Sequence, residues 1–167
     1  MNTPLRAVVL LSGGLDSTTV LAQARAAERE VYALSFRYGQ RHAVELACAE
    51  RQAARWQVRA HEVVALDHVG KLVASTTSLI AASSLAVPSA AARSPGQIPS
   101  TYVPARNTLF LAYALAWAEA LDASEIWLGI NALDYSGYPD CRPAFAAAFQ
   151  QLAAVATRAG VEGRQFV

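Results

Sequence analysis

Two glycines, two serines and one carboxylate follow one another closely in the segment SGGLDS near the N-terminus. Gly13 and Gly14 allow the backbone to approach a ligand closely, so that successive N–H groups can point at one anion. Ser12 and Ser17 add hydroxyl donors, and Asp16 is placed to hold a metal ion or to cap a helix. This combination of residues predicts a phosphate-binding loop.

The segments on either side of this loop support the prediction. Residues 7–11 form a continuous apolar run of strand length, and apolar residues at helical spacing follow from Thr18. A helix N-terminus behind a glycine turn attracts anions, because its free N–H groups and its dipole favour negative charge. The lysine of the Walker pattern and the third glycine of the dinucleotide fingerprint are both missing. The alternative is a plain glycine turn, which Ser12, Asp16 and Ser17 make less attractive.

The rest of the chain must supply the scaffold for this loop. The chain has 167 residues, of which 54% are hydrophobic and 16% are charged. This length and composition predict one globular domain over residues 1–167. The net charge of +1 argues against nucleic-acid binding. We find no signal peptide and no apolar run that could span a bilayer, and we therefore expect a cytoplasmic protein. Cys48 and Cys141 cannot by themselves form a disulfide framework or a four-ligand zinc site.

Strand-like and helix-like segments alternate along the chain. Strands are expected at residues 7–11, 31–36, 60–65 and 125–130, and helices at 17–28, 40–56, 107–121 and 143–158. A fifth strand is expected to begin near Gln165. The alternation predicts an α/β fold with a doubly wound, mostly parallel five-stranded sheet and helices on both faces, as in Rossmann-like proteins. Ligands of such sheets bind at the carboxyl ends of the strands, near the switch in strand order.

Three further stretches bear on a ligand. Residues 35–40 follow the second strand and are a candidate adenine wall, although Tyr38 could equally be an ordinary amphipathic aromatic residue. Residues 129–142 combine carboxylates with tyrosines, which suits a flat nitrogen heterocycle, although such a run is also a common turn. Residues 75–100 are rich in Ala, Ser and Pro. We expect them to form a functional lid or a mobile insertion, partly disordered without ligand.

Four segments together resemble the 7-cyano-7-deazaguanine synthase family of queuosine biosynthesis, which belongs to the PP-loop ATP pyrophosphatases. They are SGGLDSTT from residue 12, SFRYGQRH from residue 35, YVPARN from residue 102 and GINALDYSGYPDCR from residue 129. The first is typical of any PP-loop protein, whereas the second and fourth distinguish this family. The resemblance implies an ATP-dependent ligase of the adenine nucleotide alpha hydrolase type. Such an enzyme converts 7-carboxy-7-deazaguanine and ammonia to 7-cyano-7-deazaguanine through adenylated intermediates.

The resemblance also implies roles for individual residues. Asp16, Arg106 and Arg142 would be catalytic, with Asp16 near Mg²⁺, although Arg106 could also be a solvated arginine at a helix end. Substrate would contact Asn107, Gly129, Asp134, Tyr138 and Asp140. ATP would contact Leu11, Ser12, Gly13, Gly14, Leu15, Asp16, Ser17, Thr18, Thr19, Val20, Leu21, Ser35, Tyr38 and Gln40.

Two features depart from the family pattern. Ala105 replaces a glycine that is usual in the family, so a positive φ at this position would be strained. Family members also continue for several dozen residues and carry a four-cysteine zinc site near the C-terminus. No such ligand set is present here, and we expect a C-terminally truncated member of the family.

Several alternatives stay open on the sequence alone. The chain could be a non-catalytic or poorly active ATP-binding remnant, or a PP-loop adenylating enzyme for another substrate. The expected partners are the deazaguanine substrate and ammonia, without nucleic acid or membrane, and a homodimer is a possible assembly. Bound groups expected from the resemblance are ATP and Mg²⁺, with zinc only in full-length members.

Overall fold

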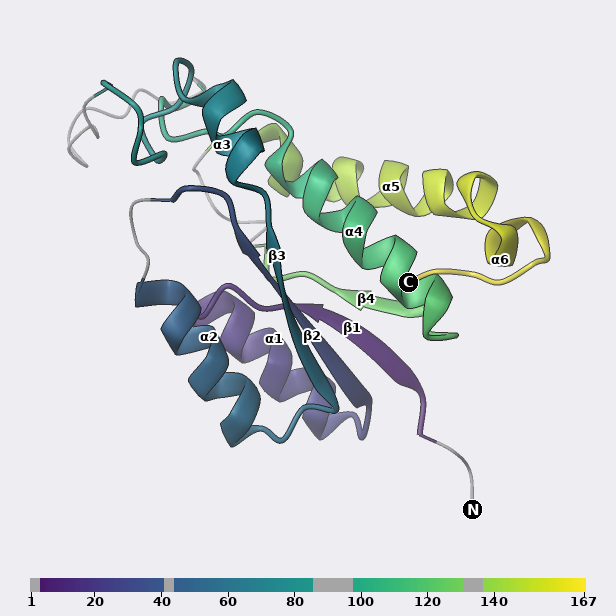
Figure 1. Cartoon of the computed structure of the whole chain (residues 1–167). Helices are drawn as coiled ribbons and strands as arrows, with labels where there is room; N and C mark the ends of the chain where they lie inside the picture. The colour runs from purple at the N-terminus through teal and green to yellow at the C-terminus, as the bar shows by residue number, and fades with distance from the viewer. Residues whose placement is uncertain (1–3, 41–43, 86–97, 131–136) are drawn as a thin grey trace.

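A parallel β-sheet lies at the centre of the computed structural model, which describes residues 4–40, 44–85, 98–130 and 137–167 (Figure 1). The elements follow in the order β1 (Arg6–Leu10), α1 (Leu15–Ala26), β2 (Glu30–Arg37), α2 (Val44–Arg55), β3 (Ala60–Ala65), α3 (Asp67–Val73), α4 (Arg106–Ala120), β4 (Glu125–Trp127), the 3-10 helix η2 (Pro139–Cys141), α5 (Pro143–Ala156) and α6 (Arg158–Val161).

The strand order is β3-β2-β1-β4, and every pairing is parallel. Leu10 on β1 pairs with Leu34 on β2, and Val8 pairs with Ile126 on β4. The order therefore reverses at β1, because β2 and β3 lie on one side of it and β4 lies on the other. This confirms the predicted doubly wound parallel sheet and places its switch point between β1 and β4.

The sheet of the described residues has four strands, so the prediction of five was wrong. At the position expected for the fifth strand, Val167 donates its N–H to the Ser124 carbonyl at 2.9 Å and accepts the Ile126 N–H at 2.8 Å. This is the bonding pattern of a parallel pair, but it involves a single residue and does not amount to a strand. The fourth strand is also shorter than expected and ends at Trp127.

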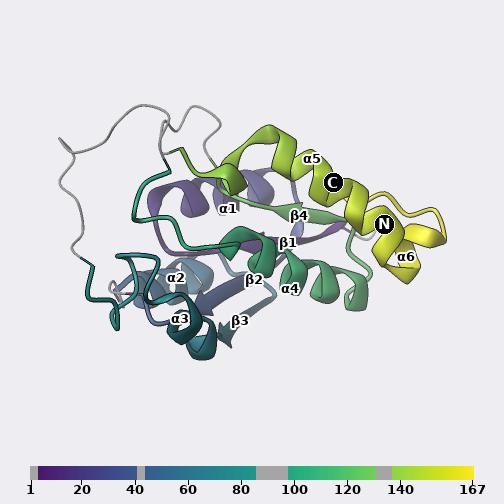
Figure 2. The ribbon, with the colours of Figure 1, turned by 90° about the horizontal axis from the view of Figure 1, so that it is seen from above.

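Helices cover both faces of the sheet, with α1 and α2 on one face and α4 and α5 on the other (Figures 1 and 2). Side chains of a strand alternate between faces, so neighbouring residues of β1 enter different cores. Val9 packs with Leu21 of α1 in one core, whereas Val8 packs with Leu111 of α4 in the other. All four side chains are nearly or fully buried.

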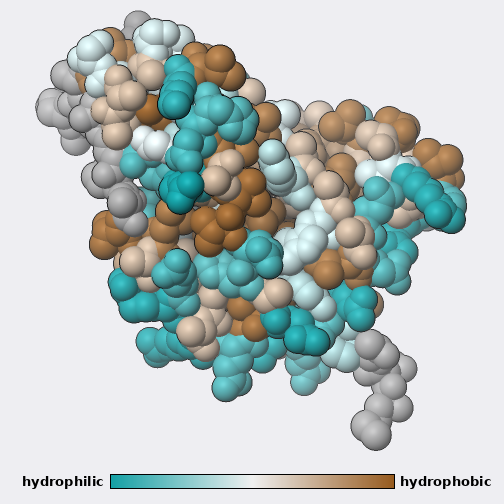
Figure 3. Space-filling model, viewed as in Figure 1, coloured by the Kyte–Doolittle hydropathy of each residue, from teal (hydrophilic) through white to brown (hydrophobic). Residues whose placement is uncertain are grey.

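The C-terminal helical region differs from the single helix predicted for residues 143–158. Thr157 has extended backbone angles, and its hydroxyl accepts the Gly160 N–H at 2.9 Å while donating to the Ala153 carbonyl at 2.8 Å. A threonine in this conformation caps a new helix, so α5 ends and α6 begins here. Leu152 and Val155 of α5 are exposed. Figure 3 shows hydrophobic surface in the region of α5 and α6.

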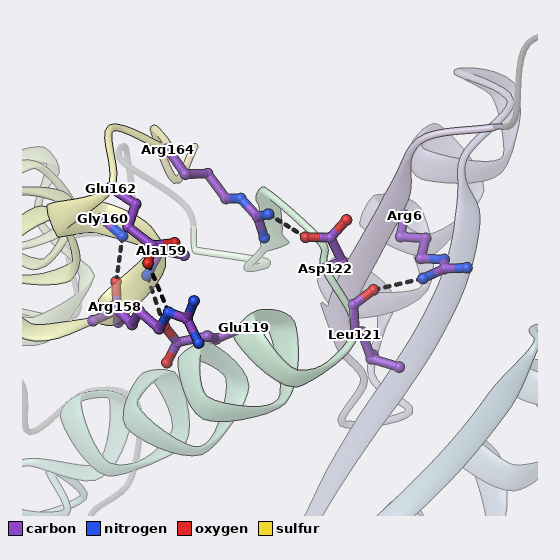
Figure 4. A network of polar contacts seen from close by, with 10 residues as sticks. Arg6, Glu119, Leu121, Asp122, Arg158, Ala159, Gly160, Glu162 and Arg164 are labelled. Atoms are coloured by element: carbon purple, nitrogen blue, oxygen red, sulfur yellow. Dashed lines mark hydrogen bonds and ion pairs between the residues drawn. The ribbon is translucent and has the colours of Figure 1, made fainter.

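Polar contacts attach α6 and the segment after it to the end of α4 (Figure 4). The Glu119 carboxylate accepts the Ala159 backbone N–H at 2.9 Å, and Arg164 forms an ion pair with Asp122. These contacts lie near the amino ends of the strands. They therefore stabilise the edge of the fold that lies opposite the predicted ligand site.

The stretch of residues 75–100 is described only in part. Residues 86–97 lie outside the described residues, so the expectation of disorder is not tested. The described part includes Thr77, Ser78 and Ile80, which are all buried, and Ile80 forms an isolated antiparallel bridge with Gln40. This part therefore packs against the segment that follows β2.

No helix in the described ranges is long and apolar enough to cross a membrane.

Candidate functional site

The loop between β1 and α1 is organised by its own two serines. The Ser12 N–H donates to the Ser17 hydroxyl oxygen at 3.2 Å, and the two hydroxyl groups lie 3.0 Å apart. The Gly14 N–H donates to the Ser12 hydroxyl oxygen at 3.3 Å, while the Ser17 hydroxyl donates to the Gly14 carbonyl at 3.1 Å. The serine hydroxyls, expected as donors to a ligand, thus shape the loop in this structure.

Two glycines allow the loop to be enclosed closely from both sides. Gly13 has a φ of +86°, and a Cβ atom there would lie 2.1 Å from the carbonyl oxygen of Glu45 at the start of α2. On the other side, a Cβ atom at Gly129, just after β4, would lie 3.0 Å from the Ser17 backbone nitrogen. A side chain at Gly13 would require the backbone to shift, and a side chain at Gly129 would be tightly crowded. The loop therefore sits between α2 and the chain leaving β4.

The first turn of α1 follows the loop directly, and no side chain caps the N-terminus of this helix. Gly14 is the N-cap residue and has no side chain to accept from the helix. Asp16 is exposed in this first turn. The arrangement leaves the helix N-terminus to an anionic ligand.

Leu21, predicted to contact ATP, has no exposed surface in the core beneath the helix. It cannot contact a ligand here, because helical periodicity turns this position toward the sheet.

A cavity of about 260 Å³ opens beside the loop at the carboxyl ends of β1 and β2. Its position agrees with the rule that ligands of doubly wound sheets bind at a switch in strand order. The predicted site residues Leu11, Ser12, Tyr38, Gln40, Arg106 and Asn107 line it, together with Leu10, Leu34, Phe36, Glu45, Phe110 and Leu128, which the sequence analysis did not select.

One wall of this cavity is aromatic. The rings of Phe36 and Phe110 are stacked with centroids 4.0 Å apart, and Tyr38 lies 5.5 Å from Phe110. Gln40 holds the segment after β2 in place, because its side-chain oxygen accepts the Tyr38 N–H at 2.9 Å and its side-chain nitrogen donates to the Phe36 carbonyl at 3.1 Å. The wall presents flat apolar surface that suits a purine ring.

Ser35 was selected as an ATP contact, but the structure turns its side chain away from the cavity. Leu34 and Phe36 line the cavity, and strand alternation therefore places Ser35 on the opposite face of β2. Its hydroxyl is buried and donates to the Leu11 carbonyl at 2.5 Å. The sequence held a usable signal for this outcome, since Leu34, Phe36 and Tyr38 are spaced by two and must share one face.

Arg106 begins α4 and lines both the cavity and a small adjoining cleft with Tyr138 and Asp140. Burial by itself lowers the pKa of the Arg106 guanidinium, but contacts with Tyr38 and the negative charge of Asp140 outweigh this effect, so the pKa is raised overall. The side chain therefore carries a full positive charge at the wall of the cavity. A partly desolvated arginine in this position is suited to bind phosphate.

The loop expected to bind substrate is linked to α4. Asp140 is buried, and its carboxylate accepts the Asn107 backbone N–H at 3.1 Å. The Tyr138 hydroxyl lies 2.6 Å from the Thr101 hydroxyl. Asp140 and Asn107 are therefore engaged with each other in this structure, and their contacts with substrate stay predictions. Asp134, also predicted to bind substrate, lies outside the described residues.

The remaining site predictions concern Arg142 and the metals. Arg142 is exposed at the N-cap of α5 and does not line the cavity, so the structure does not bring it together with Arg106. An exposed carboxylate at Asp16 fits Mg²⁺, which usually takes one or two carboxylates together with phosphate oxygens and water. No group of three potential metal ligands from His, Cys, Asp and Glu occurs in the described part of the chain.

The sequence is similar to those of known proteins. The family model described as queuosine biosynthesis protein QueC matches residues 6–166. The 7-cyano-7-deazaguanine synthase of Ectopseudomonas mendocina is 55% identical over 162 residues, which cover 96% of this chain and 69% of that protein. The synthase of Cupriavidus metallidurans is 55% identical over 161 residues, or 96% of this chain and 68% of that protein.

Among solved structures, the NH3-dependent NAD synthetase from Campylobacter jejuni aligns with a TM-score of 0.47 and 16% sequence identity. The alignment covers 73% of this chain and 46% of that protein.

Proposed function

The chain belongs to the family of the queuosine biosynthesis protein QueC, and we propose that it acts as a 7-cyano-7-deazaguanine synthase that consumes ATP. Its substrates would be 7-carboxy-7-deazaguanine and ammonia. One structural observation supports this proposal most directly: Ser12 of the loop that leads into α1 and the charged side chain of Arg106 line one cavity with an aromatic wall. Such a cavity suits a nucleotide with both a purine ring and phosphates.

The chemistry requires activation because a carboxylate has no good leaving group. In the proposed first stage, a carboxylate oxygen attacks the α-phosphorus of ATP, pyrophosphate leaves, and an acyl adenylate forms. Ammonia then attacks the acyl carbon, AMP leaves, and a proton is lost to give the amide. In the second stage the amide oxygen attacks the α-phosphorus of a second ATP and pyrophosphate leaves, and the adenylated amide then loses AMP and protons to give the nitrile.

The protein's contribution to these steps would be positioning and charge stabilisation. Backbone N–H groups at the start of α1 would hold phosphate oxygens, and Arg106 would balance negative charge developing at the α-phosphate. Asp16 would hold Mg²⁺ beside the phosphates when the ion is bound. The rings of Phe36 and Phe110 would support the adenine or the deazaguanine. No covalent intermediate with the protein is needed.

A product assay tests the proposal. Purified protein is incubated with ATP, Mg²⁺, ammonium and 7-carboxy-7-deazaguanine, and both AMP and the nitrile are quantified by chromatography and mass spectrometry. We expect two AMP per nitrile and no AMP when the deazaguanine is omitted. ATP binding without any product would support the alternative of a non-catalytic nucleotide-binding protein. AMP formed only with a different carboxylate would support another adenylating activity.

A further inference from the structure

Two side chains outside the cavity hold the first peptide of the phosphate loop. We propose that Ser35 and His61 are positioning residues that fix the orientation of the Leu11–Ser12 peptide and thereby prepare the loop for ATP. The expected effect on ATP binding rests on the proposed function, whereas the contacts themselves do not depend on it. Ser35 lies on β2, and His61 lies on the neighbouring strand β3.

The direction of each hydrogen bond follows from the chemistry of the groups. The Ser35 oxygen lies 2.5 Å from the Leu11 carbonyl oxygen and 2.8 Å from Nε2 of His61. A carbonyl oxygen can only accept, so the single hydroxyl proton of Ser35 must point to Leu11. Ser35 can then only accept from His61, which requires the proton of the imidazole to be on Nε2.

The protonation state of His61 does not disturb this arrangement. Burial lowers the pKa of His61, and the negative charges of Glu50 and Glu62 oppose this effect only in part. The ring is therefore neutral at pH 7, and the contact with Ser35 selects the tautomer that carries hydrogen on Nε2. The protonated ring also carries hydrogen on Nε2. We therefore expect orientation of the Ser35 hydroxyl rather than a pH switch.

The peptide held by Ser35 is also held from its other end. The Leu11 carbonyl accepts from Ser35, while the N–H of the same peptide, which belongs to Ser12, donates to the Ser17 hydroxyl oxygen at 3.2 Å. The Leu11 N–H belongs to the preceding peptide and donates to the Leu34 carbonyl at 2.9 Å. Rotation of the Leu11–Ser12 peptide would break contacts on both sides.

Loss of this restraint would affect the loop beyond Leu11. Ser12 also accepts the Gly14 N–H, so a rotated peptide would displace the Ser12 hydroxyl that shapes the turn. A loop that must be ordered upon binding has lower affinity than one already in position. Removing one buried hydrogen bond of this kind is expected to weaken ATP binding about five- to tenfold.

Two pairs of variants separate orientation from simple stability. Ser35→Ala removes the hydroxyl and Ser35→Thr retains it; His61→Leu removes the donor and His61→Gln supplies an amide N–H in its place. Thr157→Val is the matched control, because it removes another buried hydroxyl that donates to a carbonyl, at the start of α6. Calorimetry gives the dissociation constant for ATP, and thermal denaturation gives the melting temperature.

We expect Ser35→Ala and His61→Leu to bind ATP five- to tenfold more weakly than wild type. Ser35→Thr and His61→Gln should bind ATP with nearly wild-type affinity. Thr157→Val should lower only the melting temperature. In steady-state assays the loss should appear mainly in KM for ATP rather than in kcat. Wild-type affinity in Ser35→Ala and His61→Leu, despite a lower melting temperature, would overturn the proposal.

A measurement without nucleotide keeps this inference separable from the proposed function. Amide hydrogen exchange at Ser12 and Gly14 reports the order of the loop in the free protein. We expect faster exchange at both amides in Ser35→Ala but not in Thr157→Val. Unchanged exchange would overturn the positioning role even if ATP binds. Faster exchange in a protein that fails to bind ATP would retain the positioning role and overturn only the proposed function.

Discussion

The Asp140 carboxylate accepts the backbone N–H of Asn107 at 3.1 Å, and the Asn107 side chain in turn donates to the Asp140 carbonyl at 3.0 Å. Asp140 therefore caps α4 from a segment that lies more than thirty residues further along the chain. Both residues are buried. The reciprocal contact attaches Asp140, near the end of the predicted substrate loop, to the helix that carries Arg106.

This contact predicts different effects for two substitutions of Asp140. Asp140→Ala removes the cap and should destabilise the protein by about 1–2 kcal/mol in urea denaturation. Asp140→Asn keeps an acceptor oxygen and should lose less. If Asp140 also binds the deazaguanine, Asp140→Asn should nevertheless weaken its binding in calorimetric titration. Equal stability of wild type and Asp140→Ala would show that the cap contributes nothing.

The backbone of Ala105 leads to the second prediction. The residue has a φ of 54° and a ψ of 22°. This is the positive φ that we expected to be strained for an alanine at this position. A left-handed conformation is unfavourable for alanine and accessible to glycine, so relief of strain should exceed the entropy that glycine adds to the unfolded chain. We expect Ala105→Gly to raise the free energy of unfolding by about 0.5–1 kcal/mol. A destabilised variant in urea denaturation would contradict this explanation.

The third prediction concerns Asp16 and magnesium. The exposed carboxylate lies in the first turn of α1, and Asp16→Asn removes its charge with almost no change in shape. We expect the variant to bind ATP about tenfold more weakly when Mg²⁺ is present. In EDTA, wild type and variant should bind ATP with similar affinity, which serves as the control. Equal affinities in Mg²⁺ would remove the metal role from Asp16.

Arg106 and Arg142 were both predicted to be catalytic, but only Arg106 lines the cavity. Arg106→Gln should therefore reduce kcat on the order of 100-fold, because charge developing at the α-phosphate loses its stabilisation. Arg142→Gln is the matched control and should remain within a few-fold of wild type. A larger loss of kcat in Arg142→Gln than in Arg106→Gln would contradict this assignment and would indicate that Arg142 acts in the reaction.

A pH prediction follows from Glu125 on β4. Burial by itself raises the pKa of Glu125, but hydrogen bonds from Arg29 and Trp127 outweigh it, so the pKa is lowered in the folded protein. Because the pKa of Glu125 in the folded protein is below its ordinary value of 4.5, the ionised carboxylate stabilises the fold at pH values above 4.5. This stabilisation is lost as the pH falls through the pKa that Glu125 has in the folded protein. Glu125→Gln should therefore melt at a lower temperature than wild type at pH 7.

The difference between the two proteins should shrink as the pH falls below 4.5 and disappear once Glu125 is protonated in the wild type. Glu162→Gln provides the control, because its ion pair with Arg158 is exposed and should change little with pH. A melting difference that stays constant from pH 7 to acid would show that the charge of Glu125 is not the cause.

Much of the fold and of the geometry of the glycine loop could be predicted from local sequence features. The glycine turn between an apolar strand and a helix depends on neighbouring residues, and the alternation of strands and helices requires parallel crossovers with helices on both faces. The strain expected at Ala105 likewise concerns the backbone angles of a single position. Such features are encoded within a few residues, because backbone sterics and short-range periodicity decide them.

The tertiary structure decided which side chains meet at the cavity. Strand alternation placed Phe36 on the cavity wall and Ser35 beneath the loop, where His61 from another strand completes its hydrogen bonds. Asp140 became a helix cap, and Arg142 was placed away from the cavity. These outcomes depend on strand register and on packing between segments far apart in the sequence. A list of residue types and spacings does not contain that information, because contact between distant segments arises only when the chain is folded.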